Sequence, residues 1–221
     1  MRSLLAILVL LLLPACAVQS PRASGDILVI GDSVMAWNKA SGRDIGSAIE
    51  AELGRDVTSR AVPGAGITSS GLGLLARPVS SQLGQGRWNW VVINGGANDL
   101  GALCGCSRCD SAVDRLISRD GRSGDIPRLI AAARATGARV LWMGYYKAPD
   151  TSLFRGCRPA LVEIERRIAR LAEAVPGVTF ADAEDVMPPG RPDLLASDRT
   201  HPSPAGSALI GRYLARIIAS G

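Results

Sequence analysis

Five short, mostly apolar runs separated by longer segments constrain the fold of this chain more than any other feature. The runs are Ile27–Ile30, Val57–Val62, Trp90–Ile93, Arg139–Met143 and Val178–Phe180. A strand with one exposed face alternates apolar and polar residues, whereas a strand buried on both faces is a nearly continuous apolar run. The connecting segments are long enough for crossover helices, so the sequence predicts a five-stranded parallel sheet.

The connecting segments have the apolar period of helices that cover a sheet with one face. The last of them begins with Ser203 as the expected N-cap and Pro204 at the first helical position. Apolar residues recur at helical spacing at Ile45, Ala48, Ile49 and Leu53; at Ile126, Leu129, Ile130 and Ala133; at Leu161, Ile164, Ile168 and Leu171; and at Leu209, Ile210, Tyr213, Leu214, Ile217 and Ile218. Helices on both faces of a parallel sheet form a three-layer α/β/α sandwich, whose sites lie at the carboxyl ends of the strands.

The amino-terminal segment has the pattern of a secretion signal. A basic start at Arg2 precedes an apolar run from Leu4 to Leu13, and Ala15 and Ala17 form a small-residue cleavage site. The run has about ten residues, whereas a membrane-spanning helix needs about 20. We therefore expect a signal peptide over residues 1–17, a spacer over residues 18–25 and one domain over residues 26–221.

Two processing routes fit this segment, and both export the protein. Cleavage after Ala17 is the favoured route and gives a periplasmic or secreted protein. The run from Leu13 to Cys16 also resembles a bacterial lipobox, although Pro14 is unusual there. In that case Cys16 would be acylated and would anchor the protein to a membrane.

Export determines how the other four cysteines are interpreted. Cys104, Cys106 and Cys109 form a C-x-C-x-x-C cluster, and Cys157 lies far from it in the sequence. Such a set could bind zinc in the cytosol, but an oxidising compartment favours two disulfides. Four cysteines allow three pairings, and the sequence does not select one of them.

The composition argues against several classes of function. The chain of 221 residues has a net charge of +5, but its 25 Lys and Arg residues are scattered and only 4% of its residues are aromatic, unlike a nucleic-acid-binding surface. His201 is the only histidine, so no multi-histidine metal site can form. Ser69 stands where a dinucleotide loop beginning at Gly64 needs its third glycine. We expect no metal, no cofactor and no nucleic-acid partner.

Two of the expected strands are followed directly by motifs that suit a reaction site. Gly31-Asp32-Ser33 follows the first strand, so Ser33 lies on a tight turn with its hydroxyl at the sheet edge. Gly64 and Gly66 follow the second strand, where glycine lets a backbone N–H point at a ligand. Each motif alone also fits an ordinary helix cap or turn.

Two further motifs complete the set. Asn98 and Asp99 follow the third strand after a glycine turn, and a side-chain amide in that position can donate a hydrogen bond to an oxyanion. Asp198 precedes His201 by three residues, a spacing at which a carboxylate can accept a hydrogen bond from the imidazole ring. The motifs all fall at strand ends and therefore at one edge of the sheet.

In their order and spacing, these motifs resemble the four sequence blocks of the SGNH/GDSL hydrolase family. The matching residues are Gly31-Asp32-Ser33, Gly64, Gly96-Ala97-Asn98-Asp99 and Asp198-x-x-His201. The resemblance spans residues 26–221 and implies a flavodoxin-like sandwich. It implies that Ser33 is the nucleophile, His201 the base and Asp198 its partner.

The resemblance also implies an oxyanion hole formed by the backbone N–H of Ser33, the backbone N–H of Gly64 and the side-chain amide of Asn98. The second block contains two glycines, so Gly66 is an alternative to Gly64 as the donor. The cysteine cluster that follows the third block is not part of the general family pattern.

The function implied by the resemblance is hydrolysis of a carboxylic ester, on a small molecule or a glycan, through an acyl-enzyme. An O-acyltransferase or deacetylase that acts on a sugar is one alternative. A non-catalytic binding module with the same fold is another, which the intact set of Ser33, Asp198 and His201 disfavours. Four aromatic residues either border an acyl pocket or pack around the sheet edge: Trp37, Tyr145, Tyr146 and Phe154.

Overall fold

The computed structural model describes residues 24–68, 77–147 and 154–221. The expected signal peptide, the candidate acylation site Cys16, residues 18–23 of the expected spacer and Ser69 lie outside the described residues. Within these described ranges, no helix combines the length and the apolar character needed to span a bilayer.

The five expected strands form one parallel sheet with the order β2-β1-β3-β4-β5. The strands are β1 (Ser24–Ile30), β2 (Val57–Ser59), β3 (Arg87–Ile93), β4 (Arg139–Met143) and β5 (Val178–Ala181). The predicted α/β class and five-stranded parallel sheet are confirmed. Strands β1 and β3 begin earlier than the predicted apolar runs, with more polar residues that pair at Ser24 with Arg87, and β2 ends at Ser59 instead of Val62.

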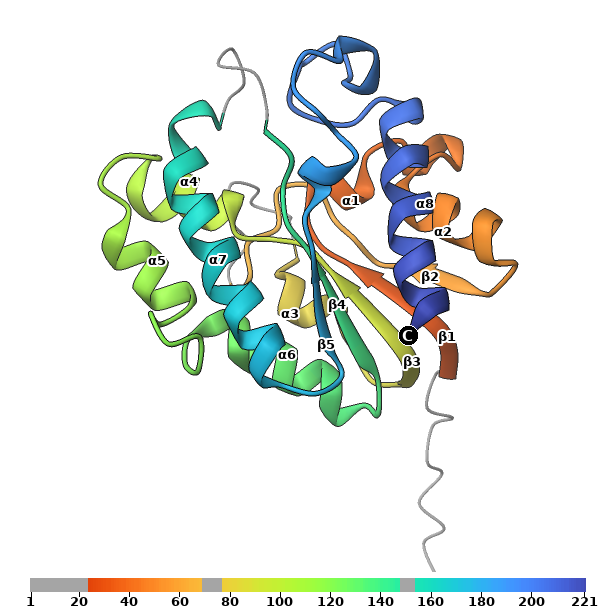
Figure 1. The fold of residues 1–221 in the computed structure, drawn as a ribbon, viewed down its shortest axis with the longest axis horizontal. Coiled ribbons are helices and arrows are strands. Elements are labelled where there is room, and N and C mark those ends of the chain that lie inside the picture. The colour runs from red at the N-terminus through yellow and green to blue at the C-terminus, as the bar shows by residue number, and fades with distance from the viewer. Residues whose placement is uncertain (1–23, 69–76, 148–153) are drawn as a thin grey trace, which may run out of the picture.

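The helices lie on both faces of the sheet (Figure 1). Helices α2 and α8 pack against each other on one side, and α5, α6 and α7 lie on the other. The helices are α1 (Ser33–Ala36), α2 (Ile45–Leu53), α3 (Val79–Gln82), α4 (Ala97–Cys104), α5 (Asp110–Leu116), α6 (Asp125–Ala135), α7 (Arg158–Ala174) and α8 (Pro204–Ser220), with short 3-10 turns at Lys39–Ser41, Arg155–Cys157, Ala183–Asp185 and Pro192–Leu194. This is the expected three-layer sandwich.

Helix α8 illustrates how the apolar period positions a helix. Ser203 caps its first turn by accepting a hydrogen bond from the Gly206 N–H, and Pro204 is its first residue. Ile210, Leu214 and Ile218 face the core and are buried, and each contributes about 1.5–3 kcal/mol by leaving water. The close approach of α8 to α2 requires a glycine, because a Cβ at Gly211 would lie 2.4 Å from the Cβ of Ala48.

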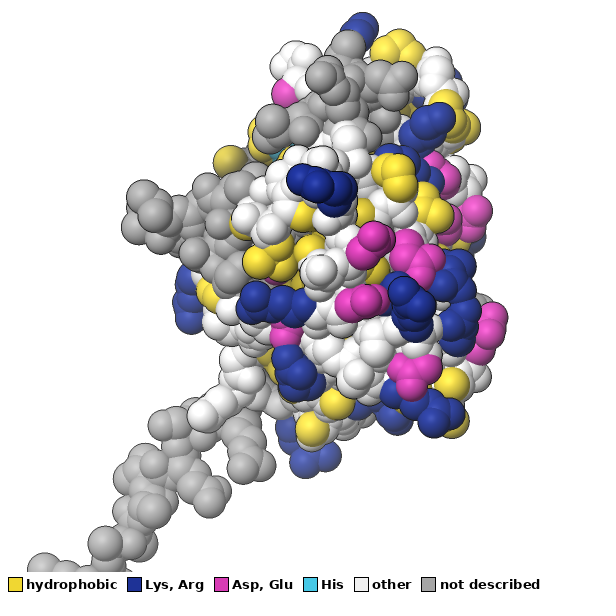
Figure 2. Space-filling view, turned by 90° about the vertical axis from the view of Figure 1, so that its left-hand side faces the viewer, with side chains coloured by type: hydrophobic (Ala, Val, Ile, Leu, Met, Phe, Trp, Pro, Cys, Tyr) yellow, Lys and Arg dark blue, Asp and Glu magenta, His cyan; other side chains and the backbone are white. Residues whose placement is uncertain are grey.

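The face formed by α5 and α7 carries charges of both signs. Figure 2 shows basic and acidic side chains interspersed over this side of the molecule. The exposed Arg166 pairs with Glu163 at 2.7 Å, and the buried Arg167 pairs with Asp114 of α5 at 2.6 Å. The charged groups on this face therefore largely neutralise one another.

Two disulfides hold the segment between α4 and α7. Cys104 is bonded to Cys109, and Cys106 is bonded to Cys157 at the beginning of α7. The expectation of two disulfides is confirmed, and the structure selects one of the three possible pairings. The short bridge closes the loop between α4 and α5, and the long bridge ties this loop to α7.

The two disulfides should differ in their contribution to stability. In the chain-entropy account, the Cys106–Cys157 bridge, with a sequence separation of 51, contributes about 4 kcal/mol, and the Cys104–Cys109 bridge, with a separation of 5, contributes about 2 kcal/mol. The Cys106→Ala/Cys157→Ala variant should therefore unfold at lower urea concentration than the Cys104→Ala/Cys109→Ala variant. Four reactive thiols among these cysteines in the denatured, unreduced protein would contradict this assignment.

Candidate active site

Ser33 lies where β1 ends and α1 begins, and buried polar side chains fix this turn. Gln82 of α3 forms two hydrogen bonds with Gly31, accepting from its N–H at 2.8 Å and donating to its carbonyl at 2.9 Å. Asp32 caps α1 by accepting from the Val34 N–H at 2.9 Å. The backbone on both sides of Ser33 is therefore held by side chains that water does not reach.

His201 lies in the loop that leads into α8. Asp198 accepts hydrogen bonds from the backbone N–H groups of Thr200 at 2.9 Å and His201 at 3.0 Å, so its carboxylate organises the loop. The imidazole ring stacks on Trp37, with the ring centroids 3.8 Å apart and an interplanar angle of 7°. The loop sets the position of the histidine, and the indole restricts the plane of its ring.

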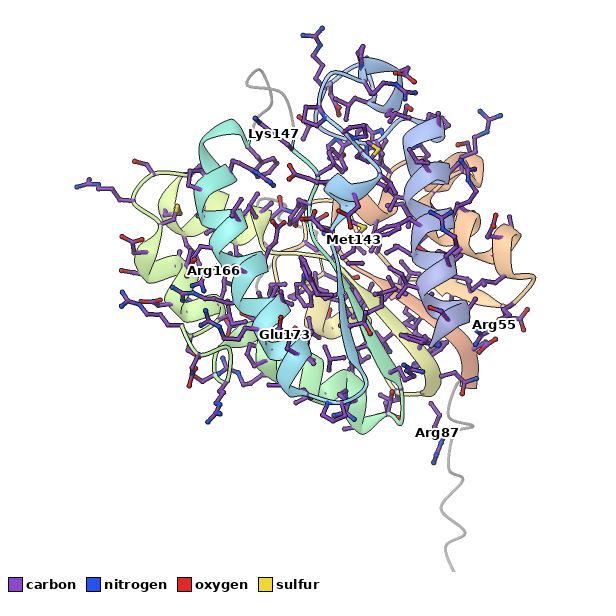
Figure 3. The ribbon with its side chains drawn as sticks, viewed as in Figure 1. Arg55, Arg87, Met143, Lys147, Arg166 and Glu173 are labelled. Atoms are coloured by element: carbon purple, nitrogen blue, oxygen red, sulfur yellow. A yellow bond between two sulfur atoms is a disulfide. The ribbon has the colours of Figure 1, made fainter. Side chains whose placement is uncertain are left out.

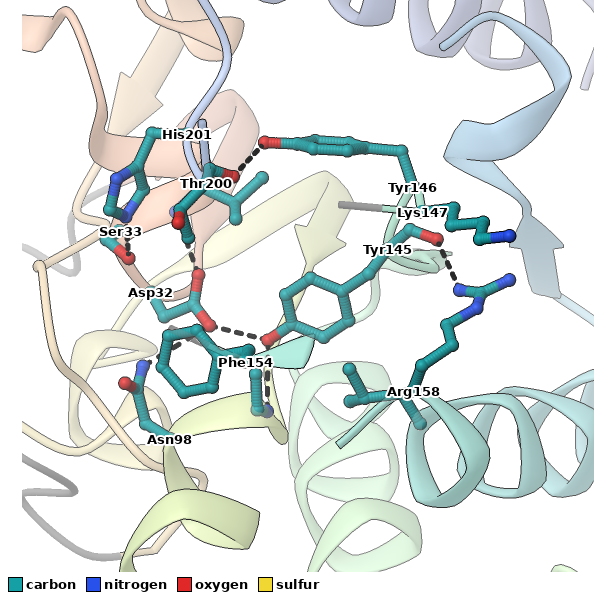
Figure 4. Close-up of a pocket in the computed structure, with 13 residues that line it drawn as sticks. Asp32, Ser33, Asn98, Tyr145, Tyr146, Lys147, Phe154, Arg158, Thr200 and His201 are labelled. Carbon is teal, nitrogen blue, oxygen red and sulfur yellow. Dashed lines mark hydrogen bonds between the residues drawn. The ribbon is translucent and has the colours of Figure 1, made fainter. Parts of the chain in front are cut away.

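Ser33, His201 and Asp198 form one hydrogen-bonded chain. Ser33 Oγ lies 2.8 Å from His201 Nε2, and His201 Nδ1 lies 2.6 Å from Asp198 Oδ2. A carboxylate only accepts hydrogen bonds, so the proton of neutral His201 is on Nδ1, and Nε2 accepts from the serine hydroxyl. The structure thus brings together the three side chains that the sequence indicated, from opposite ends of the domain. Figure 4 shows two of them, Ser33 and His201, side by side.

The hydrogen bonds to Asp198 keep it ionised. Partial burial alone would raise the pKa of the Asp198 carboxyl, but the hydrogen bonds from the His201 ring and from the His201 and Thr200 N–H groups outweigh burial and lower it. An ionised Asp198 stabilises a positive charge on His201 when Nε2 takes up a proton.

Asn98 and Asp99 connect the ends of β1, β2 and β3. The amide of Asn98 donates to the Ala65 carbonyl at 3.1 Å and reaches Asp32 at a longer distance of 3.4 Å. The carboxylate of Asp99 accepts from the Ile67 N–H, with its two oxygens at 2.9 and 3.0 Å. The two neighbours at the start of α4 thus hold the same loop by different bonds.

The same loop contains the two candidate glycine donors. Gly64 has a φ of +76°, in the region that favours glycine. The carbonyl of Gly66 accepts a hydrogen bond from the Val79 N–H at 2.9 Å, which ties that residue to α3. The turn therefore occurs at Gly64, and Gly66 belongs to the segment that packs on α3.

Asp32 is paired with a tyrosine that the sequence did not assign to it. The hydroxyl of Tyr145 donates to Asp32 Oδ2 at 2.5 Å and accepts from the Ala97 N–H at 3.2 Å. Burial raises the pKa of Asp32, whereas the hydrogen bonds from Tyr145 and Val34 oppose this rise. Burial beside Asp32 also raises the pKa of the Tyr145 hydroxyl, which stays protonated and able to donate.

A small cavity of about 70 Å³ opens beside Ser33. Its lining contains three of the four aromatic candidates, Tyr145, Tyr146 and Phe154, together with Asn98 and His201 (Figure 4). The fourth candidate, Trp37, does not line this cavity but stacks on His201. No periodicity or motif identifies that contact, because a stacked pair formed by two loops leaves no pattern in the sequence.

Glu165 of α7 supports the cavity wall from behind. Its carboxyl accepts from the Tyr145 N–H at 2.7 Å, and only 7% of the residue is exposed. Burial raises the pKa of Glu165 to about 8, although this hydrogen bond and Arg158, 3.9 Å away, lower it. The sequence shows Glu165 only as a polar residue between the apolar positions of α7, and it contains no sign of this burial.

Comparisons with known proteins agree with this architecture. Residues 29–209 match the GDSL-like lipase/acylhydrolase family. A comparison of the sequence with curated proteins found no match. Among solved structures, a protein from Slackia heliotrinireducens assigned to the SGNH hydrolases is 22% identical, with a TM-score of 0.59 over 89% of this chain and 100% of the other.

Two further solved structures are similar in fold. A protein from Desulfitobacterium hafniense DCB-2 assigned to the G-D-S-L lipolytic family is 14% identical, with a TM-score of 0.61 over 87% of this chain and 99% of the other. A family two carbohydrate esterase from Clostridium thermocellum, solved in complex with cellohexaose, is 18% identical, with a TM-score of 0.60 over 89% of this chain. This chain spans 64% of the length of that esterase.

The buried carboxyl of Glu165 should make stability depend on pH. Its pKa is about 8 in the folded protein against an ordinary value of 4.5, so between these values the folded state binds more protons than the unfolded state. Stability should therefore fall as pH rises through this window, and Glu165→Gln, which cannot ionise, should remove that part of the fall. Between pH 5 and pH 8, the free energy of unfolding measured with urea should fall by about 2 kcal/mol or more for wild type relative to the variant.

Glu163→Gln is the matched control on the same helix. The Arg166 side chain lowers the pKa of Glu163 to about 2, so this carboxylate stays ionised over the whole window. Glu163→Gln should change the free energy of unfolding by the same amount at every pH between 5 and 8, so its dependence on pH should match that of wild type. Parallel curves for wild type and Glu165→Gln would show that Glu165 does not titrate as expected.

Proposed function

Because this chain belongs to the GDSL-like lipase/acylhydrolase family, we propose that it hydrolyses carboxylic esters through an acyl-enzyme. The observation that carries the proposal is the hydrogen-bonded chain of Ser33, His201 and Asp198, with distances of 2.8 and 2.6 Å. A non-catalytic module has no need for a serine hydroxyl aligned on an imidazole that is itself oriented by a carboxylate.

The proposed reaction follows from the proton positions. Ser33 Oγ attacks the ester carbonyl carbon while its proton moves to His201 Nε2, and Asp198 stabilises the resulting imidazolium. The tetrahedral intermediate collapses, the carbon–oxygen bond to the alcohol breaks, and Nε2 returns the proton to the leaving oxygen. Water then repeats these steps on the acyl-enzyme and releases the acid.

Three groups are proposed to stabilise the oxyanion: the backbone N–H groups of Ser33 and Gly64 and the amide of Asn98. The left-handed conformation at Gly64 and the hydrogen bond to the Gly66 carbonyl support Gly64 over Gly66. The amide of Asn98 makes one short and one long hydrogen bond. The long one, to Asp32, is the weaker of the two and is the one that a substrate oxygen would replace.

The volume beside Ser33 supports a short acyl group. A cavity of about 70 Å³ holds only a few water-sized groups, which suits an acetyl group better than a fatty acyl chain. The fold similarity to a carbohydrate esterase complexed with cellohexaose supports a sugar as one form of the alcohol part. Transfer of the acyl group to a sugar hydroxyl would use the same residues.

The disulfides support a location outside the cytoplasm. Two bridges in one small domain are typical of exported proteins, because cytosolic reductants keep thiols reduced. We propose an exported protein that is either cleaved after Ala17 or acylated at Cys16.

The catalytic assignment predicts a specific series of losses. Ser33→Ala and His201→Ala should each abolish nearly all hydrolysis of para-nitrophenyl acetate, since the chain has no second histidine. Asp198→Asn should leave more activity and still cost several orders of magnitude, because the imidazole loses its orienting charge. Turnover by His201→Ala at the wild-type rate would refute the mechanism, provided that circular dichroism confirms its fold.

A chain-length series tests the size of the acyl group. With para-nitrophenyl acetate, butyrate and octanoate, we expect kcat/KM to be highest for acetate and to fall with length, because the cavity beside Ser33 is small. A preference for octanoate would show that the acyl chain binds elsewhere.

The proposed catalytic role of Asn98 can be separated experimentally from its structural role in the turn. Asn98→Ala should lower kcat about 10²- to 10³-fold with little change in KM, as expected for a bond made mainly in the transition state. Asp99→Ala is the neighbouring control, because its carboxylate holds the Ile67 N–H and is proposed to have no contact with the oxyanion. It should mainly lower the melting temperature. A larger loss of kcat in Asp99→Ala, at matched stability, would refute this assignment.

A further inference from the structure

A second and larger cavity adjoins the first one. It has a volume of about 470 Å³, and Tyr146 and Lys147 line both cavities. Its opposite wall is the segment from Met187 to Arg199, which leads directly into the Asp198–His201 loop. A molecule that fills both cavities would therefore pass beside His201.

The lining of the second cavity is apolar with basic side chains. Its apolar residues include Met187, Leu194 and Leu195, its charged residues are Lys147, Arg191 and Arg199, and no Asp or Glu of the described residues lines it. Arg191 is neutralised by Asp193 at 2.6 Å. Lys147 and Arg199, in contrast, form no ion pair with any residue that the structure describes.

Local structure does not account for these two basic residues. Arg199 has a φ of +55°, a conformation that costs about 1–2 kcal/mol for a residue with a Cβ and that glycine or asparagine adopts more readily. Lys147 follows the carboxyl end of β4 and lies at the opposite end of the sheet from Arg55 and Arg87 (Figure 3). Both cations are therefore at the edge where the reaction site lies.

The chemistry of the leaving group determines which part of an ester enters this cavity. His201 Nε2 must give its proton to the leaving oxygen, so the alcohol part lies on the His201 side of the acyl carbon. Ala196, Ser197 and Arg199 of the same loop form the cavity wall on that side. The acyl part then occupies the smaller cavity, between Asn98 and Phe154.

We propose that the second cavity is the subsite for the alcohol part of the substrate, and that Lys147 and Arg199 select alcohols with an anionic group. The anion is a carboxylate or a phosphate, both of which arginine binds through two parallel N–H donors and lysine through its point charge. The apolar wall suits a ring or hydrocarbon portion between this anion and the ester oxygen. This inference rests on the proposed ester hydrolysis for the direction of the alcohol.

Three aryl acetates test the selectivity: para-acetoxybenzoate, para-acetoxyphenyl phosphate and the neutral methyl para-acetoxybenzoate. The measured quantity is the ratio of kcat/KM for an anionic ester to kcat/KM for the neutral ester. Lys147→Met/Arg199→Met should lower this ratio about 3- to 10-fold, and about 0.5 M NaCl should lower the wild-type ratio in the same direction. Comparison of the two anions shows which one the site prefers.

The matched control removes two positive charges elsewhere. Arg212 and Arg216 are exposed on α8 and line neither cavity. Arg212→Met/Arg216→Met has the same net charge as the test variant, so it reproduces any effect of overall charge on association with an anion. We expect it to leave the selectivity ratio within about twofold of wild type.

A binding measurement separates this proposal from the proposed function. Para-hydroxybenzoate, the alcohol product, should bind to Ser33→Ala more tightly than its methyl ester does, and this preference should disappear when Lys147→Met/Arg199→Met is added. If no ester is hydrolysed but this preference is observed, the proposed function fails, and the second cavity stands only as a binding site for an anionic ring compound. If the esters are hydrolysed but neither the ratio nor the binding depends on Lys147 and Arg199, the subsite is refuted and the function stands.

Discussion

The parallel pairing of β1 with β3 is the constraint on which the candidate active site depends. It brings the end of β1, where Ser33 begins a helix, beside the end of β3, where Asn98 lies in the first turn of another. Helix α8 follows the last strand and packs on α2, so the loop before α8 passes over the same sheet edge and delivers His201 to Ser33. A serine, an amide and an imidazole from three distant segments meet because every strand points the same way.

A buried polar network then fixes side chains that the sheet alone would leave free. Asp32 Oδ2 accepts a hydrogen bond from the Tyr145 hydroxyl at 2.5 Å and lies 3.4 Å from Asn98 Nδ2, so one carboxyl links three segments of the chain. A buried network of this kind lowers stability if one of its polar groups lacks a hydrogen-bond partner, and it is rigid when every polar group has one. Burial raises the pKa of Asp32, which lies next to the proposed oxyanion, whereas the hydrogen bonds from Tyr145 and Val34 oppose this rise.

The sequence predicted the parts of the molecule that follow from local chemistry and strand direction. The apolar runs identified all five strands, and helical spacing identified the buried faces of α2, α6, α7 and α8. The rule that parallel strands end together places Ser33 and Asn98 at one sheet edge, and the structure brings them there. The rule does not account for His201, because β5 ends at Ala181 and the histidine reaches the same edge through the long segment before α8.

The contacts that the sequence did not predict depend on the directions of side chains from distant segments. The position of Tyr145 after β4 is readable, but its hydrogen bond to Asp32, 113 residues away, is not. The same holds for the stacking of Trp37 on His201 and for the choice of Cys157 as the partner of Cys106. Around the cysteines, left-handed φ values at Cys106 and Arg108 separate α4 from α5, and no apolar period predicts this break.

The proposed base combines a firmly held ring with a solvent-accessible partner. The side chain of His201 is 15% exposed and that of Asp198 is 37% exposed, so water screens the charge of the carboxylate. The hydrogen bond between Nδ1 and this carboxylate orients the imidazole, and two further restraints support it. The backbone N–H groups of Thr200 and His201 hold Asp198 in place, and the indole of Trp37 lies against the ring. Because these restraints do not depend on excluding water, the site can admit the water molecule that the proposed deacylation consumes.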